Sequence, residues 1–575
     1  MYRWAVYPRL FLKTRLLLLI GADAFACGGE ATSPDTIVEP AEGVTATPEP
    51  AKSSLTMLFG VVPTVLGVWG SDSVAGDSLT GPGCTISPVH AVCQDLATDV
   101  LTYIDSTTFE VVPLSGTQGW EQVDSNRWRF SLTPGVKFHN GEPWNAAAAK
   151  QGIDIQGTES IGQASHSYTG TISGEVVDDL TVDVVCEVDC PILPRSAFLI
   201  GFQAPGWWNS ASNLERTEKT IGFGPYVQVE HRRGRHIYME KYEDYVPNPM
   251  APNDAQAPTI DEIFVETRSE ALVRATMVEV GEADWAMNLN LAHKDRVPVF
   301  KTGGAAETFV LVHDTIWHPE LSKRDVRLAL AHATDCDLIV EQFYEGLFTC
   351  QGTYAPPGTL GATDRTMAQY EYDPDLARQL LADANYDPAN SITINVFEGR
   401  YPNNVELSEA QVGMWQDVGI SGNVVVLETG RWLDVARTGC GRAWREVKGD
   451  DPGDSYCLDV PPGPPCFCQP NSFQLNPSLE TLDFARALGR MDCNDSGSKF
   501  CDPVNVQPLL DPARAARLDG SPSRQELMEQ LVDIAYDEAI IYTYFDALVF
   551  YGSSADLDWE TRFDRRMRPN NWTLN

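Results

Sequence analysis

Two different strand patterns divide this chain, and this division limits the folds open to it. Residues 128–132 alternate apolar and polar side chains, which is the period of a half-buried strand. The alternation resumes over residues 136–138, just before Asn140-Gly141, a pair that favours tight hairpin turns. Residues 225–230 and 236–241 are also separated by a short turn. The first half of the chain is therefore predicted to hold antiparallel hairpins.

The second half changes to a rhythm of helices between strands. Residues 324–347 place apolar side chains mostly on one helical face, and Asp373-Pro374 supplies an N-cap and a first-turn proline for another helix. Strands are predicted at 391–397 and 423–427, with a helix between them. Such a β-α-β order predicts an α/β lobe that is distinct from the hairpins. A last helix around residues 527–534 leads into a strand at 539–545.

The length of the chain requires more than one packed unit. Its 575 residues exceed what one hydrophobic core usually organises, so two or three units are expected. Hydrophobic residues make up 43% of the chain and charged residues 21%, which excludes wholesale disorder and fibrous structure. The bulk of the chain is predicted to be globular.

The N-terminal residues have the pattern of an export signal. Four basic residues precede the apolar run Leu16–Ile20, which leads through Ala24-Phe25-Ala26 to Cys27. The run is too short to remain in a bilayer as a helix, and Asp23 would be costly there. Residues 1–26 are therefore expected to be a cleaved signal peptide.

Cys27 is expected to carry a lipid. Cleavage before it resembles bacterial lipoprotein processing, although Ala24-Phe25-Ala26 also fits an ordinary signal-peptidase site at the same bond. Residues 27–53 are rich in Thr, Pro, Glu and Ala and show no periodic apolar face, so they are expected to form a disordered tether. A tether next to a lipid-bearing cysteine would let a folded domain stand off the membrane.

The remaining cysteines indicate an oxidising compartment. Thirteen cysteines occur in all, and twelve remain without Cys27. Several lie close together in the sequence, but spacing alone does not determine their connectivity: Cys84 with Cys93, Cys186 with Cys190, Cys336 with Cys350, Cys457 with Cys466 or Cys468, and Cys493 with Cys501. A metal site around Cys466-Phe467-Cys468 is the alternative, but no CxxC pair or nearby histidine supports it. Disulfides are expected, and no metal or other cofactor.

The charge balance argues against one class of partner. The chain has 42 Lys and Arg against 80 Asp and Glu, a formal charge of −38. Such a surface repels phosphate backbones, so nucleic acid is not expected as a partner.

One phrase resembles the signature of a known family. The sequence Leu132 to Trp144, LTPGVKFHNGEPW, is similar to the signature of the family 5 extracellular solute-binding proteins, which serve ABC importers for oligopeptides, dipeptides and nickel. Further blocks occur in the order found in that family: VVPLSGTQGWEQVDSNRWRFSL, IGFGPYVQVE, DEIFVETRSEALVRATMVEVGEADWA, RDVRLALAHATD and YDPDLARQLLADANY. The resemblance is good over residues 54–430 and weaker over 440–520.

The resemblance implies an α/β fold of the two-lobed, periplasmic-binding-protein-like (type II) class, with an extra subdomain in the first lobe. Lobe I with this subdomain is expected over residues 54–268, lobe II over 269–535, and a C-terminal return to lobe I over 536–575. The lobes would close on a small solute, most simply a peptide, by a hinge motion. The resemblance further implies a monomer outside the cytoplasm that delivers this solute to an ABC permease and its ATPase subunits.

The resemblance also suggests ligand-binding residues. In peptide-binding members an aspartate after a tryptophan pairs with the peptide's amino terminus, and Trp444 followed by Asp450-Asp451-Pro452 is the nearest match. Asp451 is therefore the candidate for a cationic ligand group, and Trp444 for a cleft wall. Trp432 and Trp208, with its neighbour Trp207, could enclose a ligand, although such residues are also common in cores. His139 and Asn140 are expected to serve the turn.

Two other classes of function were considered. A secreted hydrolase is the main alternative, but the chain has no G-x-S-x-G or H-E-x-x-H motif, and no phosphate-binding glycine loop for ATP hydrolysis. The chain is thus not expected to be an enzyme, although a catalytic triad of distant residues stays open. A ligand sensor that uses the same cleft without transport is the other alternative.

Overall fold

The computed structural model describes residues 53–59, 95–157, 170–232, 235–316, 318–354, 358–397, 403–427, 472–475, 481–493 and 498–575. Residues 52–575 form one unit of the chain. The predicted signal peptide, Cys27 and nearly all of the predicted tether lie outside the described residues. Among the residues described, no helix has the length and apolar character needed to cross a membrane.

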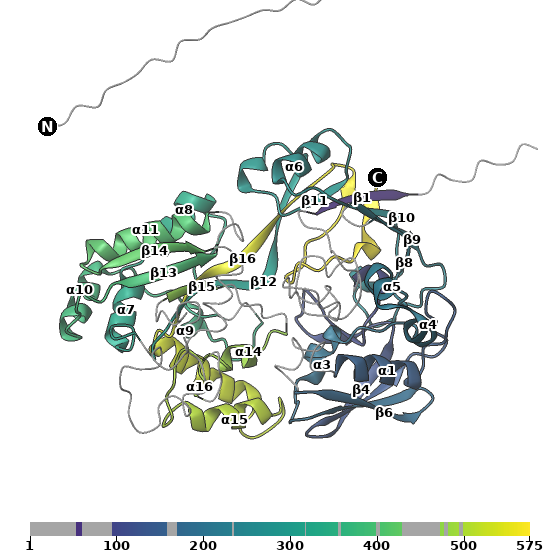
Figure 1. Cartoon of the computed structure of the whole chain (residues 1–575), viewed down its shortest axis with the longest axis horizontal. Coiled ribbons are helices and arrows are strands. Elements are labelled where there is room, and N and C mark those ends of the chain that lie inside the picture. Colours follow the sequence, from purple (N-terminus) through teal and green to yellow (C-terminus); the bar gives the residue numbers. More distant parts are fainter. Residues whose placement is uncertain are drawn as a thin grey trace, which may run out of the picture. The chain divides into compact units, whose positions relative to one another are not determined.

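A ten-stranded mixed sheet is the framework of the molecule (Figure 1). Its two long central strands are antiparallel to each other, and shorter strands continue the sheet on either side. In spatial order the strands are β14 (Gly422–Leu427), β13 (Ile392–Phe397), β15 (Ser472–Leu475), β12 (Val299–His313), β16 (Ile541–Ser553), β11 (Trp285–Met287), β1 (Ser54–Phe59), β10 (Glu262–Thr267), β9 (His236–Lys241) and β8 (Tyr226–Arg232). We call the part built on β11, β1, β10, β9 and β8 lobe I, and the part built on β14, β13 and β15 lobe II.

Lobe I combines parallel and antiparallel pairing. β1 runs parallel to both β10 and β11, whereas β8, β9 and β10 form an antiparallel meander. The predicted hairpin of residues 226–241 is therefore confirmed. Helix α6 (Ala271–Glu279) precedes β11. Trp285 of β11 lies at the centre of an aromatic core that also contains Trp559 and Trp572.

A separate four-stranded antiparallel sheet is inserted in lobe I, in the order β4 (Thr117–Asp124), β5 (Arg127–Leu132), β7 (Thr181–Cys186) and β6 (Ile172–Asp178). Helix α1 (Ala146–Gln156) packs on it, and the Asn145 side chain caps this helix by accepting a hydrogen bond from the Ala148 amide at 3.0 Å. The strand predicted at 128–132 is confirmed. The second strand, at 136–138, was predicted wrongly, because only an isolated bridge between Lys137 and Pro143 forms there.

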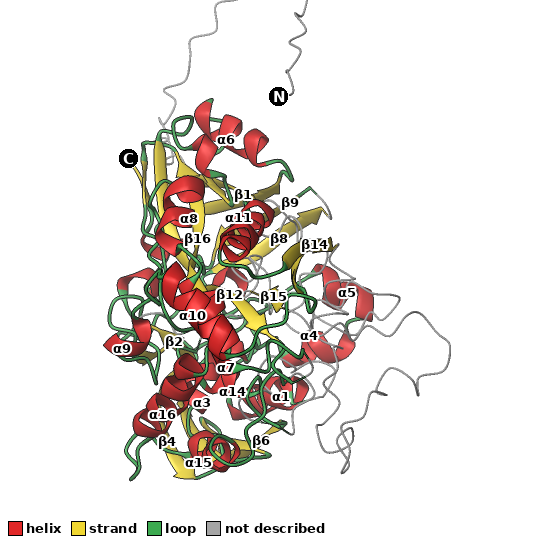
Figure 2. Cartoon of the chain, turned by 90° about the vertical axis from the view of Figure 1, so that its left-hand side faces the viewer, coloured by secondary structure: helices red, strands yellow, loops and turns green. Residues whose placement is uncertain are grey.

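Lobe II has helices on both faces of its strands. Phe309 and Leu311 of β12 pack into a core with β13 and four helices, whereas Val310 and Val312 pack into a second core on the opposite face. Figure 2 shows helices of the first core in front of the strands. The first core contains α7 (Arg324–His332), α8 (Cys336–Tyr344), α10 (Pro374–Asp383) and α11 (Asn404–Asp417), and the second α14 (Ala485–Leu488), α15 (Gln507–Ala515) and α16 (Arg524–Asp537). This layering confirms the α/β prediction.

Two helix boundaries in lobe II compare the sequence prediction with the structure. Asp373 caps α10 as predicted, since its carboxylate accepts hydrogen bonds from the Asp375 and Leu376 amides at 3.1 and 2.9 Å. The predicted single helix at 324–347 is instead two helices, α7 and α8. Asp335 ends the continuity because its carboxylate caps α8 by accepting from the Leu338 amide at 2.9 Å.

Three of the predicted close cysteine pairs are disulfides: Cys186 with Cys190, Cys336 with Cys350, and Cys493 with Cys501. The other predicted pairs lie outside the described residues. Within the described part of the chain, no cluster of His, Cys, Asp or Glu could hold a metal ion.

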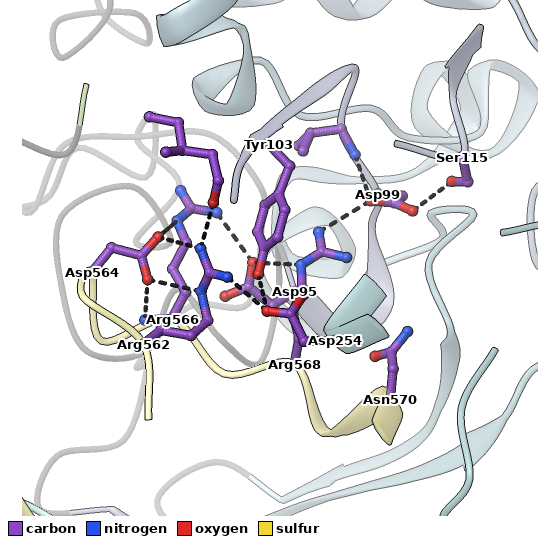
Figure 3. A network of polar contacts seen from close by, with 12 residues as sticks. Asp95, Asp99, Tyr103, Ser115, Asp254, Arg562, Asp564, Arg566, Arg568 and Asn570 are labelled. Atoms are coloured by element: carbon purple, nitrogen blue, oxygen red, sulfur yellow. Dashed lines mark hydrogen bonds and ion pairs between the residues drawn. The ribbon is translucent and has the colours of Figure 1, made fainter. Parts of the chain in front are cut away.

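The C-terminal segment carries the buried arginines Arg562 and Arg568 and the half-buried Arg566 (Figure 3). Arg562 pairs with Asp254 and Asp564, Arg566 with Asp95, and Arg568 with Asp99. The guanidinium groups of Arg562 and Arg568 also lie 4.1 and 4.5 Å from the ring centre of Tyr103. The network joins the end of the chain to residues more than 450 positions earlier.

Candidate interlobe hinge and ligand site

The two long strands β12 and β16 connect the lobes. Their pairing extends from Val299 with Ser553, on the side of lobe I, to Val312 with Ile541, on the side of lobe II. The register shifts between Gly304 and Thr308. A Cβ atom on Gly304 would lie 2.5 Å from the Phe563 carbonyl oxygen, so the C-terminal segment passes directly over β12 just before the shift. The pairing of β12 with β16 is thus irregular at the place where a hinge between the lobes would bend.

A polar cluster lies at this irregularity. Asp546 of β16 accepts hydrogen bonds from the Thr308 hydroxyl at 2.8 Å and from the Gln351 side-chain amide at 2.7 Å. Next to it, buried Glu307 forms an ion pair with Arg565 of the C-terminal segment. Burial raises the pKa of Asp546 to about 6, and the two hydrogen bonds only partly oppose this.

Asp546→Asn is expected to stabilise the protein at neutral pH. The folded state holds the Asp546 proton more tightly than the unfolded chain does, where the ordinary pKa is 3.8, so the stability contributed by the neutral carboxyl is lost as pH rises through about 6. Asparagine keeps the acceptor oxygen without the charge. We expect its free energy of unfolding to exceed that of the wild type by about 3 kcal/mol at about pH 7.5 and to differ little from it at about pH 4.

Urea unfolding at the two pH values measures this difference. Asp558→Asn is a suitable control because Asp558 is an exposed aspartate on the neighbouring strand β17 (Leu557–Asp558), and it should change the stability little. An Asp546→Asn protein that is less stable than the wild type at about pH 7.5 would show that the carboxylate is favourable in the hinge.

A small apolar recess adjoins the hinge. The disulfide Cys336–Cys350 closes a loop that includes α8 and brings Tyr344 and Phe348 to the recess. The recess is lined by Phe309, Tyr344, Phe348, Phe545, Ala547, Leu548 and Phe550. The side chains that line it carry one hydroxyl group and no charge, so it cannot pair with the charged end of a peptide.

The signature phrase has structural roles in lobe I. The Glu142 carboxylate caps α4 (Pro205–Ser210) by accepting from the Gly206 and Trp207 amides at 2.7 and 3.2 Å, and the Asn140 side-chain amide donates to it at 2.6 Å. His139 is buried with Nε2 3.0 Å from the Gly224 carbonyl oxygen, and burial lowers its pKa to about 4. These contacts agree with the predicted turn roles of His139 and Asn140.

The IGFGPY block allows two stretches of backbone to pack closely. A Cβ atom on Gly222 would lie 2.3 Å from the Ala97 carbonyl oxygen, and one on Gly224 would lie 2.6 Å from that of Leu96. Both glycines therefore let the backbone of residues 96–98 pass close by. Trp144, at the end of the signature, donates from its indole nitrogen to the Gly116 carbonyl at 2.8 Å. The two blocks hold the inserted sheet against the rest of lobe I.

The predicted ligand-binding residues are only partly within the described chain. Asp451, Trp444 and Trp432 lie outside it. Trp208 lies on α4, where the guanidinium of Arg216 is 4.5 Å from its ring centre and the Arg216 Nε donates to its carbonyl at 3.0 Å. Its role in ligand binding stays a prediction. The sequence analysis missed Asp546, although a single carboxylate inside the apolar run YTYFDALVF is a signal that could have identified it.

Solved structures establish the class of fold. Residues covering 91% of this chain match 99% of the ABC transporter substrate-binding protein CtaP from Listeria monocytogenes, with a TM-score of 0.71 at 14% sequence identity. The fold is that of a two-lobed, periplasmic-binding-protein-like α/β protein, as predicted. A likeness at this identity concerns the fold alone.

Sequence comparison places the chain more closely. The model of the bacterial extracellular solute-binding proteins, family 5, matches residues 110–456, which is more than half of the chain. The chain belongs to this family, and the predicted resemblance is confirmed.

Two curated relatives show the range of named ligands. The glutathione-binding protein GsiB of Pectobacterium atrosepticum is 27% identical over 289 residues, which are 47% of this chain and 52% of that protein. Di/tripeptide-binding protein 1 of Pseudomonas aeruginosa is 25% identical over 354 residues, 56% of this chain and 64% of that protein. The chain thus spans between half and two thirds of the length of these relatives.

Proposed function

We propose that this protein captures a peptide between its two lobes outside the cytoplasm and delivers it to an ABC importer. The family match carries the proposal, because proteins of this family are extracellular solute-binding proteins. The paired strands β12 and β16 support the proposal, since a connection of two strands lets each lobe move as a rigid body around a bound solute. Both relatives reported above are named for short peptides, since glutathione is itself a tripeptide.

The proposed mechanism is binding and release without covalent chemistry. A ligand that contacts both lobes favours the closed arrangement, because only that arrangement offers both sets of contacts. Asp451 would meet the ammonium group of the peptide, and Trp444, Trp432 and Trp208 would supply apolar walls. A carboxylate and an ammonium group attract each other more strongly in a closed, drier cleft than in bulk water.

Attachment and partners form part of the same proposal. A lipid on Cys27 and the segment 27–53 as a tether would hold the binding protein at the membrane surface, near an ABC permease and its ATPase subunits. The protein would act as a monomer. The intact mass of the protein extracted from membranes tests the anchor, because an unmodified Cys27 would contradict it.

A thermal-shift screen tests the function. The mature protein is mixed with dipeptides, tripeptides including glutathione, free amino acids and sugars. A ligand that binds only the folded state at about 100 times its Kd adds about 2.7 kcal/mol of stability, so one class should raise the melting temperature clearly. The matched control is the same peptide with an acetylated amino terminus, which lacks the ammonium group and should bind several-fold more weakly.

The Asp451→Asn variant completes the design. If Asp451 meets the ammonium group, the variant should lose most of the difference between the free and the acetylated peptide. A preference that survives in the variant would remove Asp451 from the site. No shift with any solute, together with turnover of an ester, peptide or glycoside, would contradict the binding function and favour the secreted hydrolase.

A further inference from the structure

Leu482 comes from lobe II but is buried in a core of lobe I. Its side chain is fully buried, and every other buried member of its apolar cluster comes from earlier in the chain: Val100, Tyr103, Ile104, Leu114, Ile192, Phe198, Leu199, Ala251 and Ala255. Phe484, two residues later, packs instead with β12, α15 and α16 in the second core of lobe II. Neighbouring residues of one short segment are therefore committed to the two different lobes.

The segment around Leu482 is anchored firmly in lobe II. Asp483 accepts hydrogen bonds from Arg524 of α16 at 2.7 and 3.0 Å, and both side chains are fully buried. The Leu360 amide donates to the Leu482 carbonyl oxygen at 3.0 Å. With its backbone held from both sides, the segment can present Leu482 to lobe I as a rigid projection.

Two residues at this contact have an unusual backbone. Leu482 has a φ of 49° and Phe109 of lobe I a φ of 58°, in the left-handed region that bulky side chains avoid. Phe109 lies against Gly358 of lobe II, where an added Cβ atom would be 2.8 Å from the Phe109 ring. Strained residues persist where surrounding contacts hold them and are concentrated at functional positions. Here the strain falls on both sides of one contact between the lobes.

A hydrogen bond joins the lobes beside Leu482. The Arg195 Nη1 donates to the Thr481 carbonyl at 3.2 Å, and the two residues are 286 positions apart. Arg195 belongs to α3 (Leu193–Ser196), whose other residues are buried in lobe I. The contact therefore combines a buried apolar knob, an aromatic ring over a glycine and a hydrogen bond from a cation.

We propose that these residues form an interlobe latch that stabilises the closed arrangement without a ligand. The latch consists of Phe109 and Arg195 in lobe I and Gly358, Thr481 and Leu482 in lobe II. It shares no residue with the hinge cluster around Asp546 and uses none of the predicted ligand-binding residues. The consequence is a ligand-free protein that is already largely closed. The latch itself does not depend on the proposed function. Only its expected consequence, stronger ligand binding, rests on that function.

The distance between the lobes tests the latch in ligand-free protein. Spin labels are placed on non-canonical amino acids at Val229 of lobe I and Tyr372 of lobe II, both exposed, so that the disulfides stay intact. Pulsed electron paramagnetic resonance then measures the distance between the labels. We expect one narrow distribution in the otherwise unchanged protein. Leu482→Ala should add a second, longer distribution, with the ratio of closed to open molecules lowered about tenfold.

The control is Leu488→Ala. Leu488 is also a fully buried leucine, but it lies in the second core of lobe II, so its loss should lower the melting temperature and leave the distance unchanged. Arg195→Gln, which removes the cation without emptying the apolar core, should shift the distribution in the same direction as Leu482→Ala but less. This variant keeps the test valid if Leu482→Ala does not fold.

The outcomes separate the latch from the proposed function. A distribution that is equally broad in the unchanged protein and in the folded variants would overturn the latch, even if peptides bind. A distribution that lengthens in the latch variants supports the latch, even if no peptide binds in the thermal-shift screen. If both hold, the latch variants should also bind peptide more weakly, by about the factor by which closure is lost.

Discussion

Arg568→Met should lower the free energy of unfolding by about 3–5 kcal/mol, the usual cost of removing one partner from a buried ion pair. Arg568 is completely buried, its Nη2 donates to the Asp99 carboxylate at 3.1 Å, and its Nε lies 3.8 Å from Asp95 (Figure 3). Methionine has a similar length but no charge. The variant would leave Asp99 without its arginine and Asp95 with Arg566 alone.

The loss should depend on pH. Burial already raises the pKa of Asp95, and the nearby guanidinium groups of Arg566 and Arg568 oppose that effect. Without Arg568 the Asp95 carboxyl group holds its proton more strongly in the folded state, so the stability deficit should grow as pH rises and shrink in acid. Urea unfolding at about pH 8 and about pH 4.5 measures both. Arg517→Met is the control: Arg517 pairs with Asp519 at the surface, and its loss should cost less than about 1 kcal/mol. A similar small cost for Arg568→Met would mean that the buried network adds little.

Trp285→Ala should cost about 3–5 kcal/mol through loss of packing. Trp285 is fully buried in lobe I, with its ring centre 5.4 to 5.8 Å from those of Phe59, Tyr551, Trp559 and Trp572. These partners come from β1, β16 and the C-terminal segment, so the indole ring joins separate parts of the chain. Alanine would leave a cavity that this aromatic cluster cannot easily fill.

Trp285→Phe is the matched control for this variant. The indole nitrogen of Trp285 is buried and has no hydrogen-bond partner among the residues that the structure describes, so phenylalanine removes a polar atom that gains nothing from burial there. The phenylalanine variant should therefore lose less than about half as much stability as the alanine variant. If both variants lost the same free energy of unfolding in urea, the packing would require the full size of the indole ring, and a smaller aromatic ring would not replace it.

The sequence predicted helices, strands and turns well where they depend on residues close together in the chain. The strand at 128–132, the hairpin of 226–241 and the Asp373 cap depend on neighbours within a few residues, and the structure confirms them. The errors also have local causes. Residues 136–138 alternate like a strand but lack a continuous partner, and the 324–347 pattern continues across Asp335, whose capping hydrogen bond periodicity does not reveal.

The candidate site was less accessible to sequence reasoning. The signature and the IGFGPY block identified the family correctly, yet in the structure the signature caps a helix and the IGFGPY block makes a close backbone contact. The residues predicted to meet the ligand come from the part where the resemblance is weakest, and their roles stay predictions. The predicted lobe boundaries at 268 and 535 likewise stay predictions. Asp546 was missed because Gln351, one of its partners, is 195 residues away.

By itself, the sequence determined the α/β class, the hairpin of β8 and β9 and membership of the family, because each depends on a local pattern or on a block of consecutive residues. It placed the cysteines of three disulfides close together, but the structure decided how they pair. Only the tertiary structure decided that Arg568 is buried between two aspartates and that Leu482 enters the core of the other lobe. An arginine in a polar tail and a leucine in an irregular segment look ordinary in sequence. Their environment is set by packing between residues hundreds of positions apart, and no local periodicity encodes that packing.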